Sequence, residues 1–324
     1  GINFSKALTD RLRVGLQLFA RDLGAVGNYV PRLDWFNLDY RFADWLGIRA
    51  GRLKTPFGLY NEVNDVDSAR VPVLLPQSVY PILNRDILLA QTGVEVYGYL
   101  PIRPAGAFEY RLYGGTLYLD PPVAKPPLAL KNFQIPYVVG GRVMWEAPLE
   151  GLRLGGSLQA LRFDTTYTLP AAPPAPPAEV KSGIPFLLWL GSFEYAAHDF
   201  LFAAEYGRWK ADVELTLAGM TQSETVVNER YYVMGAYRVA PWFFPGVYYS
   251  HLVENVDKPM TRDNFQDDLA LTLRFDLTSN WLLKLEGHYM HGTLDLSSDL
   301  NGGTPKNQLE RDWAAFFAKT TAYF

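Results

Sequence analysis

Apolar and polar residues alternate along much of this chain, in stretches of about ten residues that are separated by turn signals. Between Arg11 and Arg21 every second residue is apolar, and Arg13 and Gln17 are among the residues in between. Because successive side chains of a strand point to opposite faces, such a stretch has one apolar face and one arginine-bearing face. Alternation alone does not say which face is inside, because a soluble sandwich and a membrane barrel place the faces in opposite ways.

These alternating stretches predict about fifteen strands. The predicted strands are residues 2–5, 11–22, 32–42, 46–54, 90–100, 108–119, 135–146, 152–163, 184–195, 200–209, 227–238, 243–253, 265–276, 281–291 and 312–324. Short connections lie at residues 6–10, 43–45, 101–107, 147–151, 196–199, 239–242 and 277–280. Long connections lie between them, at residues 23–31, 55–89, 120–134, 164–183, 210–226, 254–264 and 292–311.

Strict alternation of short and long connections is typical of a transmembrane β-barrel, in which short turns face the periplasm and long loops face the outside. We therefore predict an all-β fold: one antiparallel transmembrane β-barrel domain over residues 1–324. The prolines between residues 169 and 179 indicate that one of the long connections is a stiff exposed loop.

The number of strands follows from parity, because bacterial single-chain barrels have even counts. On the count above, the last strand and the stub at residues 2–5 both run toward the short turns. We therefore expect one further strand before Gly1, which gives about sixteen strands, with fourteen as the fallback if weak strands are overcounted. A barrel of this size encloses an aqueous channel.

The chain ends on a predicted strand whose last residue is Phe324. A C-terminal strand that closes on an aromatic residue is the signal by which the bacterial outer-membrane assembly machinery recognises its barrel substrates. We therefore expect a bacterial outer-membrane location, with Phe324 as the assembly signal. The expected partners are the barrel assembly machinery, outer-membrane lipids and lipopolysaccharide.

Composition agrees with a barrel and excludes other classes. The chain is 48% hydrophobic and 15% aromatic, has a mean hydropathy of -0.06 and contains no cysteine. No apolar run approaches the roughly 18 residues that a membrane-spanning helix needs, which excludes a helical membrane protein. The net charge of -4 argues against nucleic acid as a partner. A large soluble β-protein with an aromatic core is the alternative fold.

The connection at residues 55–89 is the leading candidate for function. Loops longer than about 15 residues are usually functional or disordered. This one contains apolar residues such as Val73, Leu74 and Ile82, and is too apolar to lie in water. We expect it to fold into the barrel as a constriction loop that narrows the channel. The competing interpretation is a packing loop that covers a barrel rim or a subunit contact.

Charges on this loop and on the wall define the candidate site. The acids of the loop would face wall arginines such as Arg11, Arg13 and Arg49, and the opposed charges would set a transverse field that filters charged solutes. Most other lumen charges are expected to pair across strands as salt bridges. The candidate pore-lining and constriction residues are Arg11, Arg13, Arg49, Glu62, Asp65, Asp67, Arg70, Arg111, Arg142 and Arg153.

The sequence GRLKTPFG at residues 51–58, the long loop after it, the strand layout and the terminal Phe324 resemble Gram-negative porins related to the phosphate-selective porin O and P group. The resemblance spans most of the chain at the level of pattern. It implies a sixteen-stranded, trimeric channel for passive diffusion of small hydrophilic solutes and ions. This chain departs from the phosphate-specific members because its loop is acidic and has no lysine between Thr55 and Leu89. We therefore do not expect phosphate specificity. Because opposite charges at the constriction would partly cancel, we expect weak charge selectivity.

Two other functional classes stay open. One is a barrel sheath or anchor whose lumen is filled by a partner lipoprotein or electron carrier. The less favoured one is an outer-membrane hydrolase, because His251 and Ser250 are adjacent on a strand and diverge. His288 and His291 face opposite sides of a strand and do not form a metal pair. We expect no enzymatic activity, no cofactor and no metal.

Overall fold

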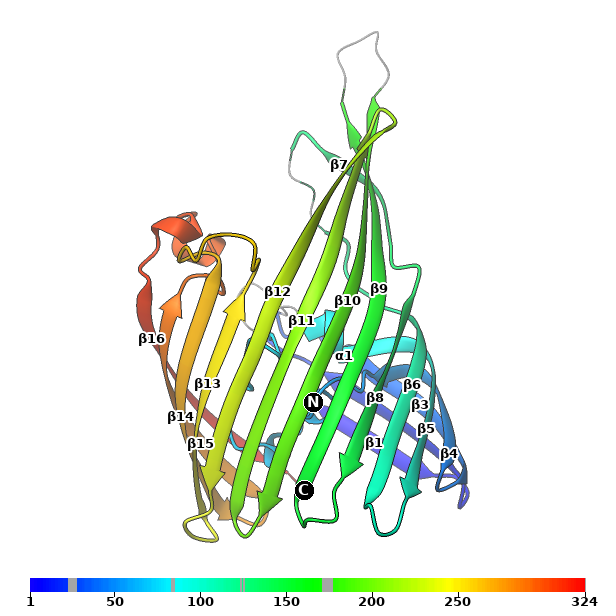
Figure 1. Ribbon diagram of the computed structural model, residues 1–324, viewed down its shortest axis with the longest axis vertical. Coiled ribbons are helices and arrows are strands. Elements are labelled where there is room, and N and C mark those ends of the chain that lie inside the picture. Colours follow the sequence, from blue (N-terminus) through cyan, green and yellow to red (C-terminus); the bar gives the residue numbers. More distant parts are fainter. Residues whose placement is uncertain (23–27, 83–84, 123, 125, 171–176, 324) are drawn as a thin grey trace.

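The computed structural model describes residues 1–22, 28–82, 85–122, 124, 126–170 and 177–323. Within these residues, sixteen strands form one curved antiparallel sheet (Figure 1). The strands are β1 (Ile2–Ala7), β2 (Leu12–Phe19), β3 (Arg32–Ala43), β4 (Leu46–Lys54), β5 (Ala90–Pro101), β6 (Ala107–Thr116), β7 (Ala129–Gln134), β8 (Val138–Glu146), β9 (Leu152–Leu169), β10 (Ala178–Ala197), β11 (Phe200–Leu217), β12 (Met220–Tyr237), β13 (Phe243–Val253), β14 (Phe265–Thr278), β15 (Trp281–Gly292) and β16 (Asp312–Ala322).

Helical structure is sparse and lies in the connections. The single α-helix of the described residues is α1 (Arg85–Leu89), and the 3-10 helices are η1 (Asn61–Val63), η2 (Asp67–Ala69), η3 (Asp299–Asn301) and η4 (Lys306–Gln308). Among these described residues, no helix is long and apolar enough to cross a membrane.

Strand order follows the chain, with one exception. Each strand pairs with the next along the sequence, but both β7 and β8 pair with β9. The β8 pairing reaches Leu161 of β9, and the β7 pairing starts at Asp164. β7 and β8 therefore act as one strand that is interrupted at residues 135–137. The predicted strand at 135–146 corresponds to β8, whereas β7 lies within the predicted connection 120–134, so this part of the prediction was wrong.

The edges of the sheet are β1 and β16, and no pairing between them is seen in the described part of the chain. Because the path between them alternates in direction over fifteen strands, β1 and β16 run the same way. An antiparallel closure needs one more strand of the opposite direction. The expected strand before Gly1 stays a prediction.

Burial distinguishes the two faces of the sheet. On β14, Leu269 and Leu271 are 50% and 56% exposed, whereas Asp268 and Thr272 are 3% and 1% exposed. A soluble protein shows the reverse, with apolar side chains buried and charged ones outside. The outer face is therefore suited to lipid and the inner face to a polar lumen.

Strands β9 to β12 are 18 to 20 residues long and rise above the other strands (Figure 1). A membrane-spanning strand needs only about 9–11 residues. The predicted loops at 164–183 and 210–226 were therefore wrong in most of their length: they are strand extensions, and β11 and β12 meet in a tight turn at Ala218 and Gly219, both with positive φ. Residues 171–176 of the predicted proline-rich loop lie outside the described residues.

The extensions escaped sequence analysis because their outward face changes character. In the barrel that face is apolar, whereas in the extensions it carries ion pairs such as Arg162–Glu214 and Lys210–Asp212. Alternation of apolar and polar residues is therefore lost although the strand continues. Charged side chains on the outward face place the extensions beyond the membrane.

An arginine scan of the outward face tests this boundary. Leu271→Arg puts a charge in the apolar band of β14 and is expected to lower the unfolding free energy by about 2–4 kcal/mol, as for charges near the bilayer midplane. Ser223→Arg, in the extension of β12, is the control on the same outward face, because Ser223 is exposed and is the register partner of Glu214; its expected cost is about 0–1 kcal/mol. Urea unfolding in lipid vesicles measures both. Equal costs would show that the extension lies in the membrane.

Candidate functional site

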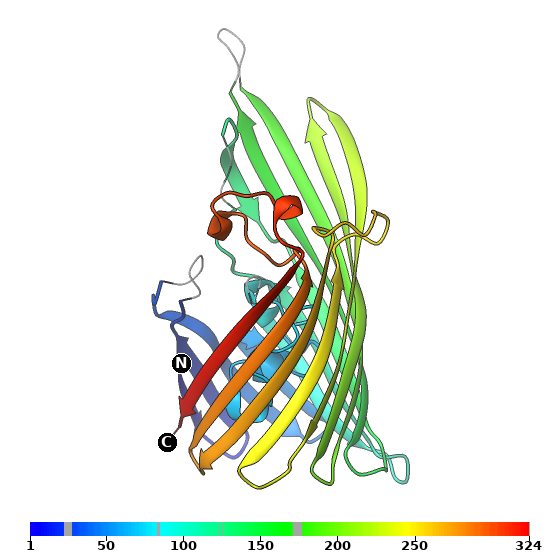
Figure 2. The same ribbon diagram turned by 90° about the vertical axis from the view of Figure 1, so that its left-hand side faces the viewer.

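The connection between β4 and β5 lies inside the curve of the sheet (Figure 2). Its apolar residues Phe57, Leu75 and Val79 are buried in one cluster with wall residues such as Leu188 of β10 and Tyr232 of β12. Each such side chain contributes about 1.5–3 kcal/mol by leaving water. The loop therefore packs firmly on the wall formed by β8 to β14.

Glu205 of β11 is the first polar anchor of the loop. Its carboxylate accepts hydrogen bonds from the Leu59 backbone N–H at 3.0 Å and from the Tyr80 hydroxyl. The wall residues Tyr232 and Ser192 donate to the same carboxylate at 2.9 and 2.5 Å. Neutral donors thus fill the lone pairs of this buried carboxylate. The arrangement ties the start of the loop and Tyr80 to one point on the wall.

Glu286 of β15 is the second anchor. It accepts hydrogen bonds from the backbone N–H groups of Val73 and Leu74 at 2.7 and 2.9 Å. The ring of His288 lies between Glu286 and Asp268, with its nitrogens 3.0 and 2.9 Å from the two carboxylates. Both nitrogens face acceptors, which suits a protonated ring that donates on both sides.

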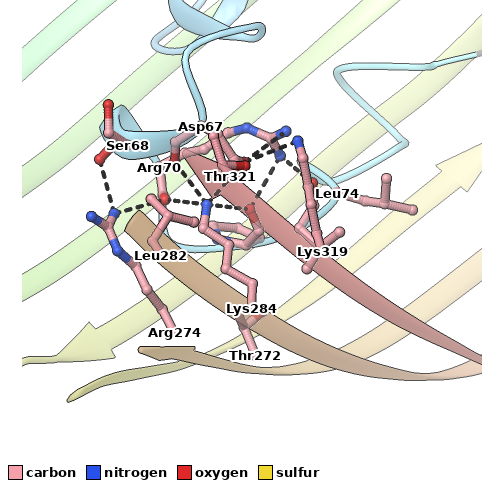
Figure 3. Close-up of polar contacts among 12 residues, drawn as sticks. Asp67, Ser68, Arg70, Leu74, Thr272, Arg274, Leu282, Lys284, Lys319 and Thr321 are labelled. Atoms are coloured by element: carbon pink, nitrogen blue, oxygen red, sulfur yellow. Dashed lines mark hydrogen bonds and ion pairs between the residues drawn. The ribbon is translucent and has the colours of Figure 1, made fainter. Parts of the chain in front are cut away.

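Asp67 of η2 is the third anchor and the most highly charged (Figure 3). Its carboxylate lies 3.1 Å from the ammonium groups of both Lys284 on β15 and Lys319 on β16, and 3.4 Å from Arg70. The Thr321 hydroxyl donates to it at 2.5 Å. Lys284 is fully buried and also donates to the carbonyl oxygen of Arg70 at 2.8 Å. One loop carboxylate therefore joins the last two strands.

The charges around the loop acids determine their ionisation. Burial by itself would raise the pKa of the Asp67 carboxyl, but Lys284 and Lys319 outweigh it and lower that pKa to about 2. Burial would also raise the pKa of Asp65, but Arg85 and Lys54 hold it below its usual value. Both carboxyls are therefore ionised at neutral pH.

Glu62 and Asp65 also have cationic partners. Glu62 lies 3.4 Å from Arg111 of β6 and 2.8 Å from Arg142 of β8. Asp65 lies 2.7 Å from Arg85 of α1 and 3.2 Å from Lys54 of β4. Each acid of the loop is thus paired with at least two cations, and none of them presents an isolated negative charge to the lumen.

The arginines expected to face these acids do not form ion pairs with them, although Glu62 lines one cavity together with Arg13 and Arg49. Arg49 pairs with Asp39 and Glu95, at 2.9 and 3.1 Å. Arg11 and Arg13 are exposed, and within the described ranges neither side chain has an ion pair. The loop acids reach further around the wall, because the loop packs on β8 to β14 and not on β2. Cross-strand pairing of the other lumen charges is as expected.

Arg70 and Arg153, two further candidates, act within the anchors. Arg70 is 8% exposed, and its guanidinium donates to the carbonyl oxygens of Pro72 at 3.1 Å and of Val73. It therefore shapes the loop from within. Arg153 pairs with Glu194 at 2.5 Å, and the same carboxylate accepts a hydrogen bond from Tyr60 at 3.3 Å.

Space remains beside the loop, along β1 to β6. Two neighbouring cavities of about 360 and 250 Å³ share Arg13, Asp39 and Arg49 in their lining. Arg11 lines the larger cavity, and Glu62 the smaller. We call these two cavities together the lane. It runs along the wall opposite to the one on which the loop packs.

The sequence does not show which wall residues anchor the loop. Alternation correctly places Glu205, Lys284 and Glu286 in the lumen, but it says nothing about what they contact. Lys284 and Asp67 are 217 residues apart in the chain. The available signal was the apolar character of the loop, which indicated packing against a wall without indicating which one. Phe324, the predicted assembly signal, lies outside the described residues.

The fold is similar to several solved outer-membrane proteins. OmpT of Vibrio cholerae superposes with a TM-score of 0.61 and 12% identity, covering 99% of this chain and 88% of that one. An anion-selective porin from Comamonas acidovorans gives 0.55 and 11%, covering 90% and 77%. The outer membrane channel DcaP of Acinetobacter baumannii gives 0.54 and 9%, covering 99% and 83%. No family model matches the chain, and no curated protein matches it in sequence.

At these identities the likeness shows the fold. The chain has the fold of outer-membrane β-barrel porins, a nearly all-β antiparallel sheet with little helix. The predicted fold class is confirmed, and so is the outer-membrane type of barrel. The finer resemblance to the phosphate-selective group has no matching family model.

Removing the charge of Asp67 tests the third anchor. Asp67→Asn leaves Lys284 buried without its counter-charge, so we expect the unfolding free energy to fall by about 3 kcal/mol. Asp44→Asn is the matched control: Asp44 pairs with Arg41 at the surface, with 80% of its side chain exposed, and such pairs are worth about 0–1 kcal/mol. Urea unfolding measures both.

Wild type and Asp67→Asn also test how the contribution of Asp67 to stability depends on pH. Because the pKa of Asp67 is lowered, its stabilisation is fully present above the unfolded value of about 4 and is lost as the pH falls toward 2. The stability difference between wild type and Asp67→Asn should therefore shrink as the pH falls from about 4 to 2. A difference that stays the same over this range would contradict the charge clamp.

Proposed function

We propose that this chain is an outer-membrane porin-like channel for passive diffusion of small hydrophilic solutes and ions, with weak charge selectivity. The observation that carries the proposal is a polar lumen in which the loop packs on one wall and leaves the lane beside it. In this proposal residues 55–89 are the constriction loop. The neighbouring folds support it, since two of the similar structures are a porin and a channel.

The charges that line the lane support weak selectivity. Glu62, Asp65 and Asp67 are each paired with cations, some of which also pair with acids of the wall, so none of the three presents an isolated negative charge. Basic and acidic side chains are balanced in the lining: Arg11, Arg13, Arg41, Arg49, Lys54 and Arg111 against Asp10, Asp39, Asp44, Glu62, Glu95 and Glu109. Balanced charges at close quarters orient a charged solute without excluding either sign.

The other expectations remain proposals. A homotrimer is supported by a solved trimer form of OmpT from Vibrio cholerae, which has a TM-score of 0.53 to this chain at 15% identity. A sheath filled by a partner lipoprotein or electron carrier has less support, because the loop of this chain already occupies part of the lumen. No observation favours a hydrolase over a channel.

Electrical recording tests the channel and its selectivity. In a potassium chloride gradient across a planar bilayer, we expect stepwise conductance with a small reversal potential that falls further as salt screens the lane. Phosphate titrated to micromolar levels should not block the current. Strong anion preference with such a block would overturn weak selectivity, and a protein that inserts without conducting would favour the filled sheath.

Cysteine labelling tests where the current flows. The natural chain has no cysteine, so Arg13→Cys provides one reactive thiol in the lane. A charged thiol reagent should then lower the single-channel current, because the bulky group narrows the lane. Tyr289→Cys, on the outward face of β15 at 55% exposure, is the control and should leave the current unchanged. Full modification of Arg13→Cys with no change in current would place the path elsewhere.

A further inference from the structure

Tyrosines on the outer face mark the level at which the membrane meets water on the side of the long loops. Three of them donate hydrogen bonds to carboxylates on the neighbouring strand. Each carboxylate lies nearer to the long loops than its tyrosine does. Tyrosine and tryptophan rings collect at this level because one end is apolar and the other polar. The pairs are Tyr206–Glu229 at 2.7 Å, Tyr249–Asp267 at 2.9 Å and Tyr289–Asp312 at 2.8 Å.

Below this level lies an apolar groove of about 730 Å³ on the outer face of β9 to β12. Its small residues Gly191 and Ala204 lie between aromatic rims. The rim toward the long loops is Trp189, Tyr206 and the ring of Tyr231, with ring centroids 5.6 and 6.3 Å apart along the row. The opposite rim is Phe193, packed edge to face on the ring of Phe202 at 5.7 Å.

A cation stands over the upper rim of the groove. Arg208 is the register partner of Trp189, and 45% of its side chain is exposed. Its Nε and Nη2 atoms lie 3.1 and 2.7 Å from Glu229, while Nη1 has no contact within the described residues. The Nη1 donor is therefore left for a further acceptor, and guanidinium groups bind phosphate well.

We propose that this groove, which we call the lipid groove, binds an acyl chain of a phosphorylated outer-leaflet lipid whose phosphate contacts Arg208. The groove is open on the side that faces lipid. A contact with a second copy of the chain would use a broad, flat surface of at least about 1,000 Å². Cation and groove together match a lipid that has an anionic head and an apolar tail.

The glycines of the outer face provide matched variants. A Cβ on Gly191 would meet only the Tyr206 carbonyl oxygen, at 3.8 Å, so Gly191→Leu fills the groove without straining the strand. Gly287 also faces outward, on β15, and a Cβ there meets nothing within 4 Å. Gly287→Leu is therefore the control. Ala204→Leu fills the same groove from β11 and serves if Gly191→Leu does not fold.

Lipid A added to the detergent-solubilised protein, followed by native mass spectrometry, tests the proposal. Wild type and Gly287→Leu should bind one lipid A with equal affinity, and Gly191→Leu should bind it at least about tenfold more weakly, a loss of one buried chain. Arg208→Gln should weaken lipid A by about tenfold and dephosphorylated lipid A by less. All variants should keep the conductance of wild type, because the proposal rests on the outer face and not on the channel.

Each contrary result points to one fault. Equal affinity of Gly191→Leu and Gly287→Leu would overturn the groove as the site. Equal effects of Arg208→Gln on both lipids would overturn the phosphate contact. If Gly191→Leu keeps lipid binding but loses an oligomer, the groove is a contact with a second copy of the chain. If diacylglycerol, which has no phosphate, binds as tightly as lipid A, the groove is a non-specific lipid contact.

Discussion

Buried carboxylates have to be satisfied by hydrogen-bond donors or by opposite charges, and this requirement organises the interior of the barrel. Glu205 and Glu286 on the wall are satisfied by donors from the loop, and Asp67 on the loop is satisfied by cations from the wall. An unpaired charge at any of these places is costly in a low-dielectric interior. The loop therefore has one well-defined position, in which all three carboxylates are satisfied together.

The position of the loop explains the shape of the lumen. Apolar packing and the three anchors hold the loop against β8 to β16, so the space that remains lies along β1 to β6. The charges that anchor the loop are paired with groups of the wall. The lane has a mixed lining of basic and acidic side chains, which come mostly from β1 to β6 and include Glu62 of the loop.

The outer face follows a different rule. Its aliphatic residues form an apolar band, and toward the long loops tyrosine hydroxyls of this face donate to carboxylates on neighbouring strands. Above that level, the extensions of β9 to β12 carry charges on the same face. The change along one strand from apolar to aromatic to charged reproduces the passage from hydrocarbon to headgroup to water. The lipid groove lies just below the aromatic level, where an acyl chain begins.

Alternation with a period of two is a local property, so the sequence by itself determined the strands, their faces and the presence of a loop inside the barrel. It also placed Lys284 and Glu205 in the lumen. Tertiary structure alone decided which distant charges meet. Lys284 and Thr321, the partners of Asp67 on β15 and β16, are 217 and 254 residues away along the chain and are brought near only by the curve of the sheet. It also decided how far β9 to β12 extend, since a strand in water keeps its hydrogen bonds after its apolar alternation ends.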